Sequence, residues 1–350
     1  MESADAEEIA ASIHACFRSL GISCLGIYSA DDIDNVSVVD ADDLDLRAVI
    51  DDSILDSRVS SHARTVDISS GSVLRFDSIP EVMWHALSGT RVLVDLCTTC
   101  KSSLSDHERL LSSHVFNAAS TNLYRGQLLY SNKWLLCLHR KIRLRFTDPV
   151  LIHRRVQWAA NQARSHVTEA LKLSSHTDQD MWRCVVRPII GYGRIHLTRA
   201  LLGLSTRSFM PKVRLACDTL NEQWRLVELT EKMGLGRLSK KDCVAWSEQL
   251  RACYSDMSQQ LDDVNLHPLK ERYWFVWIRN SLAREDVPAA AFAITYIASR
   301  AMSLLHRKNE APPEVLCNIL GSLKEKTGIM NIACTLHTML EERCSEFVGG

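Results

Sequence analysis

A chain of 350 residues, of which 46% are hydrophobic and 24% charged, can form one large domain or two ordinary ones, and this composition excludes a disordered polymer. The formal net charge is −1, the first residues are acidic, and the most apolar run, 287–305, contains Ser299, Arg300 and Ser303. Neither a signal peptide nor a membrane span is therefore predicted, and no membrane partner is expected. Twelve irregularly spaced cysteines indicate free thiols in a reducing, cytoplasmic compartment.

The small net charge conceals an uneven distribution along the chain. Residues 1–66 are rich in Asp and Glu, whereas residues 125–164 contain nine Lys and Arg and one acid, Asp148. An acidic cluster that can hold metal, together with a basic segment that can hold phosphate, suits a polyanionic substrate. Two oppositely charged, solvated surfaces that keep the chain soluble remain the alternative.

The first hundred residues combine one amphipathic helix with short strands. The helix is predicted from Ser3 to Leu20, with Gly21 as the residue that ends it. Strands are predicted at 23–28, 43–50, 63–68 and 91–96, a turn at 69–71 and a short helix at 79–87. From residue 43 on, alternation places Leu44, Leu46, Ala48 and Ile50 on a core face and Asp43, Asp45 and Arg47 on the other.

Strand signals fade after about residue 105, and helical spacing takes over. Helices are predicted at 151–173, 181–204, 212–233, 239–261, 268–282, 288–306, 313–323 and 329–347, with Ser239 as an N-cap. The fold class is therefore α+β. A small mixed-sheet domain, 1–104, precedes an all-helical domain, 105–350.

Asp43 and Asp45 are the first candidates for chemistry. Two carboxylates at i and i+2 on one strand lie about 6.5 Å apart at the backbone, so their side chains can converge on a divalent ion. Mg²⁺ prefers such oxygen ligands and usually adds substrate phosphates to them. A solvated acidic edge that leads into a half-buried strand explains the same residues.

The order of helix, strand with Gly26 and Ser29, strand with Asp43-Leu44-Asp45 and strand with Asp67 resembles the polymerase-β-type nucleotidyltransferase superfamily. The resemblance covers residues 5–96 and implies the nucleotidyltransferase-like domain fold. It implies that Asp43, Asp45 and Asp67 bind two Mg²⁺ ions, that Gly26 and Ser29 lie at the triphosphate, and that Arg47 joins the substrate-binding set. Nucleotidyl transfer needs positioning and charge neutralisation, which two metals about 3.5–4 Å apart provide.

Two further residue groups have more ordinary interpretations. Cys97, Cys100, His107 and His114 could supply four zinc ligands, but more residues separate the histidines than in zinc fingers, so zinc is not expected. The consecutive aromatics at 273–277 could stack bases, but on a helix they point in all directions, which favours core packing.

The basic segment contains Arg140, Lys141, Arg143 and Arg145. In a helix these side chains would spread around the axis, whereas in an extended segment Lys141, Arg143 and Arg145 would share a face and follow a phosphate backbone. With the acidic cluster, this predicts a Mg²⁺-dependent enzyme that transfers a nucleoside monophosphate from a nucleoside triphosphate to a hydroxyl of RNA or of a small molecule. The alternative is a non-catalytic helical protein that binds protein or nucleic acid and carries a degenerate nucleotidyltransferase-like domain.

Overall fold

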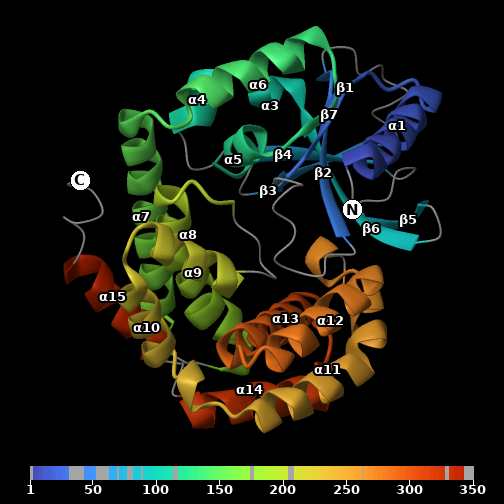
Figure 1. The fold of residues 1–350 in the computed structure, drawn as a ribbon. Coiled ribbons are helices and arrows are strands. Elements are labelled where there is room, and N and C mark those ends of the chain that lie inside the picture. The colour runs from blue at the N-terminus through green and yellow to red at the C-terminus, as the bar shows by residue number, and fades with distance from the viewer. Residues whose placement is uncertain are drawn as a thin grey trace. The chain divides into compact units, whose positions relative to one another are not determined.

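The computed structural model describes residues 3–30, 43–52, 63–68, 71–76, 82–87, 90–112, 117–173, 177–203, 209–261, 263–327 and 331–342. Backbone contacts divide the chain into two compact units, 1–155 and 156–350 (Figure 1). This division falls later in the chain than the 104/105 boundary drawn from composition, because a β-strand and several helices beyond residue 104 pack with the sheet. The first unit is α+β and the second is helical.

A seven-stranded mixed sheet forms the centre of the first unit. Its strands are β1 (Cys24–Ser29), β2 (Asp43–Ile50), β3 (Ala63–Ile68), β4 (Gly71–Phe76), β5 (Val82–Leu87), β6 (Thr90–Cys100) and β7 (Leu128–Ser131). They are ordered β3-β4-β6-β2-β1-β7, and β5 also pairs with β6. Among the strands that the structure describes, β2 and β6 are the one parallel pair, and parallel pairing requires a long crossover between them.

Helix α1 (Ser3–Ser19) covers one face of this sheet. Its apolar side chains, among them Ile9, Ile13 and Phe17, pack against the core face of β2 that alternation predicted. The helix ends as expected at Gly21, whose φ is 72°. Hydrogen bonds from Gly21 N to Arg18 O and from Ile22 N to Phe17 O complete a Schellman motif.

The other helices of the first unit are α3 (Lys101–Ser105), α4 (His107–Ser112), α5 (Asn117–Arg125) and α6 (Lys133–Arg145). Helix α6 packs on the sheet face opposite α1, where Leu135 meets Gly26 of β1. Helix α7 (Pro149–Leu171) begins in the first unit and continues into the second. The predicted helix at 79–87 is wrong, since the last part of this stretch is strand β5, paired with β6.

The helical unit contains a π-helical turn (Trp182–Val186), α8 (Arg187–Arg199), α9 (Phe209–Thr219), α10 (Gln223–Lys232), α11 (Lys240–Gln260), α12 (Glu271–Ala283), α13 (Val287–Arg307), α14 (Glu314–Thr327) and α15 (Ile332–Glu342). Ser239 caps α11 and forms a reciprocal capping box with Asp242, as predicted for the cap. The helix predicted over 212–233 is two helices, which separate near Asn221, where φ is 55°.

Helix α13 is the central helix of this unit. By length and composition it could cross a membrane, but 72% of its apolar window is buried inside the protein. Trp274 of α12 stacks on Tyr296 of α13, at 5.4 Å between ring centroids. Trp274, Phe275 and Trp277 are all buried, so the core-packing interpretation of this aromatic cluster is confirmed.

A buried ionic network joins α8 to α10. Glu222 accepts hydrogen bonds from Arg199 at 2.7 and 3.1 Å, and lies 2.8 Å from Nε of Arg225 and 3.7 Å from Nδ1 of His196. His196 and the two guanidinium groups hold the pKa of Glu222 at about 2, although burial opposes its charge. Burial lowers the pKa of His196, which is therefore neutral at pH 7.

Candidate functional site

Two carboxylates meet on the sheet face opposite α1. Asp45 of β2 is the register partner of Asp95 of β6, and neighbouring strands are about 4.8 Å apart. Asp43 lies two residues before Asp45 on the same strand, so alternation places it on the same face. The side chain of Asp43 is outside the described part of the structure. The register thus assigns residues 43, 45 and 95 to one face of the central parallel pair.

Asp67, the third acid expected from the sequence, lies elsewhere in the sheet. It belongs to β3, an outer strand, and β4 and β6 separate β3 from β2. The pairings of Asp67 with Ser72, of Val73 with Thr99 and of Cys100 with Ile50 set residue 67 level with Ile50 rather than with Asp45. Three strand spacings and five residues along the strand give a backbone separation of about 20 Å. Two carboxylates cannot share an ion at that separation, so we replace Asp67 by Asp95 as the third candidate.

Arg47 lies on the same face as Asp45, between Tyr28 of β1 and Cys97 of β6 in the register. Burial works against its charge, but the acidic groups around it, Cys97, Tyr28, Asp45 and Asp95, together raise the pKa of its guanidinium above the ordinary value. A thiol and a phenol are normally protonated at pH 7. The charges that act on Arg47 there are consequently those of Asp45 and Asp95, whose mutual repulsion it reduces.

Gly26 and Ser29 have packing roles that the sequence did not reveal. A Cβ on Gly26 would lie 2.3 Å from Cδ2 of Leu135 and 2.6 Å from the carbonyl oxygen of Tyr130. The hydroxyl of the buried Ser29 accepts a hydrogen bond of 2.9 Å from the backbone N–H of Gln127. Both residues therefore fasten β1 to the segment around β7 and to α6, and this accounts for them without a triphosphate.

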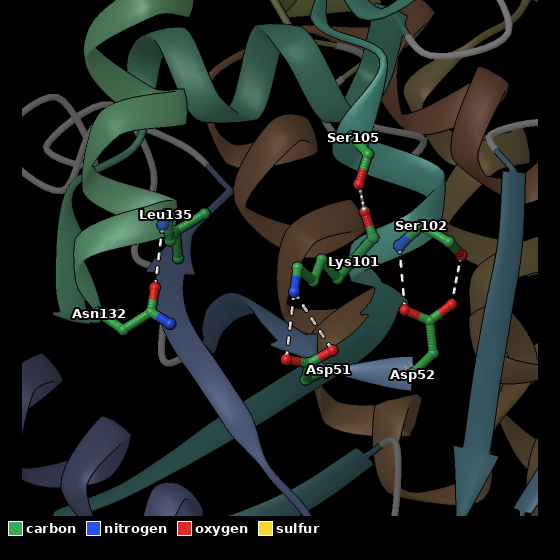
Figure 2. Close-up of polar contacts among 7 residues, drawn as sticks. All are labelled: Asp51, Asp52, Lys101, Ser102, Ser105, Asn132 and Leu135. Carbon is green, nitrogen blue, oxygen red and sulfur yellow. Dashed lines mark hydrogen bonds and ion pairs between the residues drawn. The ribbon is translucent and has the colours of Figure 1, made fainter. Parts of the chain in front are cut away.

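Polar contacts join the carboxyl ends of β2 and β6, as Figure 2 shows. Lys101 lies 3.2 Å from Asp51 in an ion pair, and the backbone N–H of Ser102 donates a 3.0 Å hydrogen bond to Asp52. The hydroxyl of Ser102 donates a second hydrogen bond to Asp52. Because both aspartates follow β2 and both partners follow β6, these contacts fix the register that places Asp45 beside Asp95.

The basic segment is helical, so the extended phosphate strip of Lys141, Arg143 and Arg145 does not exist. These residues belong to α6, where Asn132 caps the first turn by accepting a 2.9 Å hydrogen bond from Leu135 N (Figure 2). Lys141 and Arg143 are exposed, whereas Arg145 forms an ion pair with Glu108 of α4. Helical geometry separates the three cations around the axis, and the extended-segment reading is therefore wrong.

The cysteine pair does not converge on a zinc ion either. Cys97 and Cys100 are three residues apart on β6 and so point to opposite faces. Cys100 packs in the α1 core, while Cys97 lies on the Asp95 face. His114 lies outside the described residues, and His107 lies 3.5 Å from Glu108.

The donor set around Asp45 fits a hard divalent cation. Carboxylate oxygens are the ligands that Mg²⁺ prefers, and residues 43, 45 and 95 would supply three of them against one guanidinium. Among the side chains that the structure describes, no group of three His, Cys, Asp or Glu converges; the Asp43 carboxylate is not among them. The set is therefore two described carboxylates and a third placed by backbone alternation.

Asp95 was missed from the sequence although the strand at 91–96 was predicted. Its only local signal is a single acid inside the apolar run Val92-Leu93-Val94-Asp95-Leu96, the residue type and position that a buried-face ligand would have.

Comparison with family models, with curated proteins and with solved structures gives no match to this chain.

Proposed function

We propose that the first unit is a Mg²⁺-dependent nucleotidyltransferase domain whose metal ligands are Asp43, Asp45 and Asp95. The observation that carries the proposal is the register of Asp45 with Asp95 on the parallel pair, two residues from Asp43. The strand arrangement adds support. An initial helix leads into β1, β1 is antiparallel to β2, and β2 is parallel to the strand that supplies the third acid.

Each residue of this face has a task in the proposed reaction. The three carboxylates would hold the cation, and a bound cation would neutralise the triphosphate and lower the pKa of the attacking hydroxyl. Arg47 places a guanidinium beside these carboxylates, and its positive charge reduces the repulsion between them in the metal-free protein. The donor substrate is a nucleoside triphosphate, and the acceptor hydroxyl belongs to RNA or a small molecule.

The test compares Asp67, the third metal ligand expected from the sequence, with Asp95, the third ligand that the sheet register favours. Nucleoside triphosphate with Mg²⁺, at about 100 times its dissociation constant, should stabilise the folded protein by about 2.7 kcal/mol and raise the melting temperature. Asp95→Asn should abolish this shift and the release of pyrophosphate, whereas Asp67→Asn should leave both unchanged. Loss of the shift in Asp67→Asn, or its persistence in Asp95→Asn, would contradict the assignment.

A non-catalytic function, in which the first unit is only a scaffold, is the second candidate, and the packing of the expected substrate-binding residues favours it. Gly26 and Ser29 are occupied by packing, and Arg47 already supplies a positive charge beside Asp45 and Asp95. A nucleotidyltransferase-like domain that no longer binds nucleotide can still serve as a scaffold, and the helical unit would then bind the protein or nucleic-acid partner. In that case the wild-type protein itself shows no Mg²⁺-dependent shift with any of the four nucleoside triphosphates.

A further inference from the structure

The outer face of α6 is a stripe of exposed side chains at helical spacing. Lys133, Cys137, Arg140, Lys141 and Leu144 are all exposed and recur every three or four residues, so they lie on one side of the helix. The opposite side carries the buried residues that pack inward. This stripe, extended by Val150 and Arg154 at the start of α7, is called the corner surface below.

The corner surface contains the two most exposed large apolar side chains among the described residues. Leu144 is 82% exposed and Val150 is 60% exposed. They lie on either side of the turn that joins α6 to α7, six residues apart along the chain. Figure 1 shows the two helices that meet at this turn. A leucine exposed to this extent leaves most of its apolar area in water, and with Val150 close by in the chain this favours a partner that removes both from water.

Basic side chains lie close in sequence to these two apolar residues. Arg140, Lys141 and Arg143 are exposed and form no ion pair with the described residues, and Arg154 is exposed four residues after Val150. Asp148, the one acid of the turn, accepts a 2.9 Å hydrogen bond from Val150 N and so caps the start of α7. The surface is therefore cationic around an apolar tip.

We propose that the corner surface binds an anionic phospholipid membrane from one side, with Leu144 and Val150 entering the interface and the basic residues contacting headgroups. The end of α6 and the start of α7 form an exposed corner, and a protruding corner with apolar and basic side chains matches a flat, deformable anionic interface rather than a pocket in a protein. Nucleic acid would use the cations but gives no reason for a leucine that is 82% exposed. This contact needs no membrane-spanning segment and is independent of the proposed nucleotidyl transfer.

The experiment is flotation of the full chain with vesicles of phosphatidylcholine alone and with vesicles that contain about 30% phosphatidylserine. Binding to the anionic vesicles only is expected. Arg140→Gln with Lys141→Gln should weaken it about 25-fold, since each basic residue near an anionic surface contributes about fivefold. Leu144→Ser with Val150→Ser removes five side-chain carbons and should weaken it at least tenfold, because each inserted carbon that returns to water weakens binding about fourfold.

Matched controls separate this surface from general effects of charge or apolarity. Leu215→Ser with Val227→Ser removes apolar side chains that are 51% and 53% exposed in the helical unit, and Lys232→Gln with Lys241→Gln removes two exposed cations there. Both control proteins should bind vesicles as the wild type does. Binding that the controls lose equally would overturn the proposal.

Two other results would also overturn it. One is the absence of binding to anionic vesicles, with all variants folded as judged by circular dichroism. The other is salt-dependent binding to a single-stranded RNA probe that falls in the Arg140 and Lys141 variant but is unchanged by Leu144→Ser, without preference for anionic vesicles. The surface would then be a nucleic-acid surface.

Discussion

Gly26→Ala tests whether this glycine serves packing or a phosphate. The added Cβ would lie 2.3 Å from Leu135 Cδ2 and 2.6 Å from the carbonyl oxygen of Tyr130, well inside normal contact distances. The leucine can move, but the carbonyl belongs to the neighbouring strand and cannot move alone. Overpacking of this kind costs about 1–3 kcal/mol, and the backbone contact places Gly26→Ala at the upper end of that range.

A double-mutant cycle with Leu135→Ala isolates the packing contact. Leu135 is fully buried, so Leu135→Ala alone should cost about 2–5 kcal/mol. In the double variant the new methyl group occupies part of the space that the leucine leaves. The combined loss should therefore be smaller than the sum of the single losses by about 0.5–3 kcal/mol.

Hydrogen exchange measured by mass spectrometry gives a readout specific to this unit. Peptides that cover β1 and α6 should lose protection in Gly26→Ala, while peptides from α13, in the other unit, serve as the internal control. If Gly26→Ala leaves protection unchanged and removes only a nucleotide-dependent effect, Gly26 is a phosphate-contacting residue and the packing argument is refuted. Strict additivity in the cycle would also refute it.

Three further expectations follow from glycine geometry and from buried ionisable groups. A Cβ on Gly21 or on Gly321 would meet no atom within 4 Å, but of these two glycines Gly21 alone has a positive φ. Gly21→Ala should therefore lower the free energy of unfolding by about 1 kcal/mol, and Gly321→Ala, inside α14, should raise it by about 0.5–1 kcal/mol. Urea denaturation measures both, and equal effects would contradict this expectation. The pKa of Glu222 is about 2 in the folded protein and 4.5 in the unfolded chain, so its charge stabilises the fold fully above pH 4.5 and loses this effect as the pH falls toward 2. Glu222→Gln should therefore cost roughly 3 kcal/mol of unfolding free energy at pH 7 and progressively less in acid. A cost independent of pH would disprove this linkage. Burial lowers the pKa of His166 from 6.5 to about 4, so as the pH falls the unfolded chain takes up this proton first, and stability decreases from pH 6.5 to pH 4. His166→Gln should flatten the plot of melting temperature against pH in this range. An unchanged slope would exclude His166 as its source.

Structural features that depend on residues close together in the sequence could be predicted from the sequence. The end of α1 at Gly21 follows from the conformation that glycine adopts without strain, and the inward face of β2 follows from alternation of its apolar residues. The Ser239 cap likewise depends on a side chain and a backbone group three residues apart. Such features need no knowledge of the rest of the chain.

Features that depend on distant pairing were not predictable in this way. Asp67 and Asp95 each lie on a strand with a plausible pattern, and only the order of strands in the sheet tells which one lies next to Asp45. Strand β5 was mistaken for a helix because a six-residue apolar segment is ambiguous until its partner is known. The packing role of Gly26 requires α6, whose contact with β1 has no local signature.

The ion pair between Asp51 and Lys101 joins residues 50 positions apart in sequence, and the same separation applies to every pair in the β2–β6 ladder. Closing a loop of that length costs about 3.5 kcal/mol of chain entropy before any ladder contact forms. Parallel pairing of this kind forms slowly, whereas the backbone hydrogen bonds within each α-helix of the second unit join residues only four positions apart. During refolding, helical circular dichroism should therefore recover before the face that holds Asp45 and Asp95 exists, and the chain passes through a state in which the edges of β2 and β6 are still unpaired.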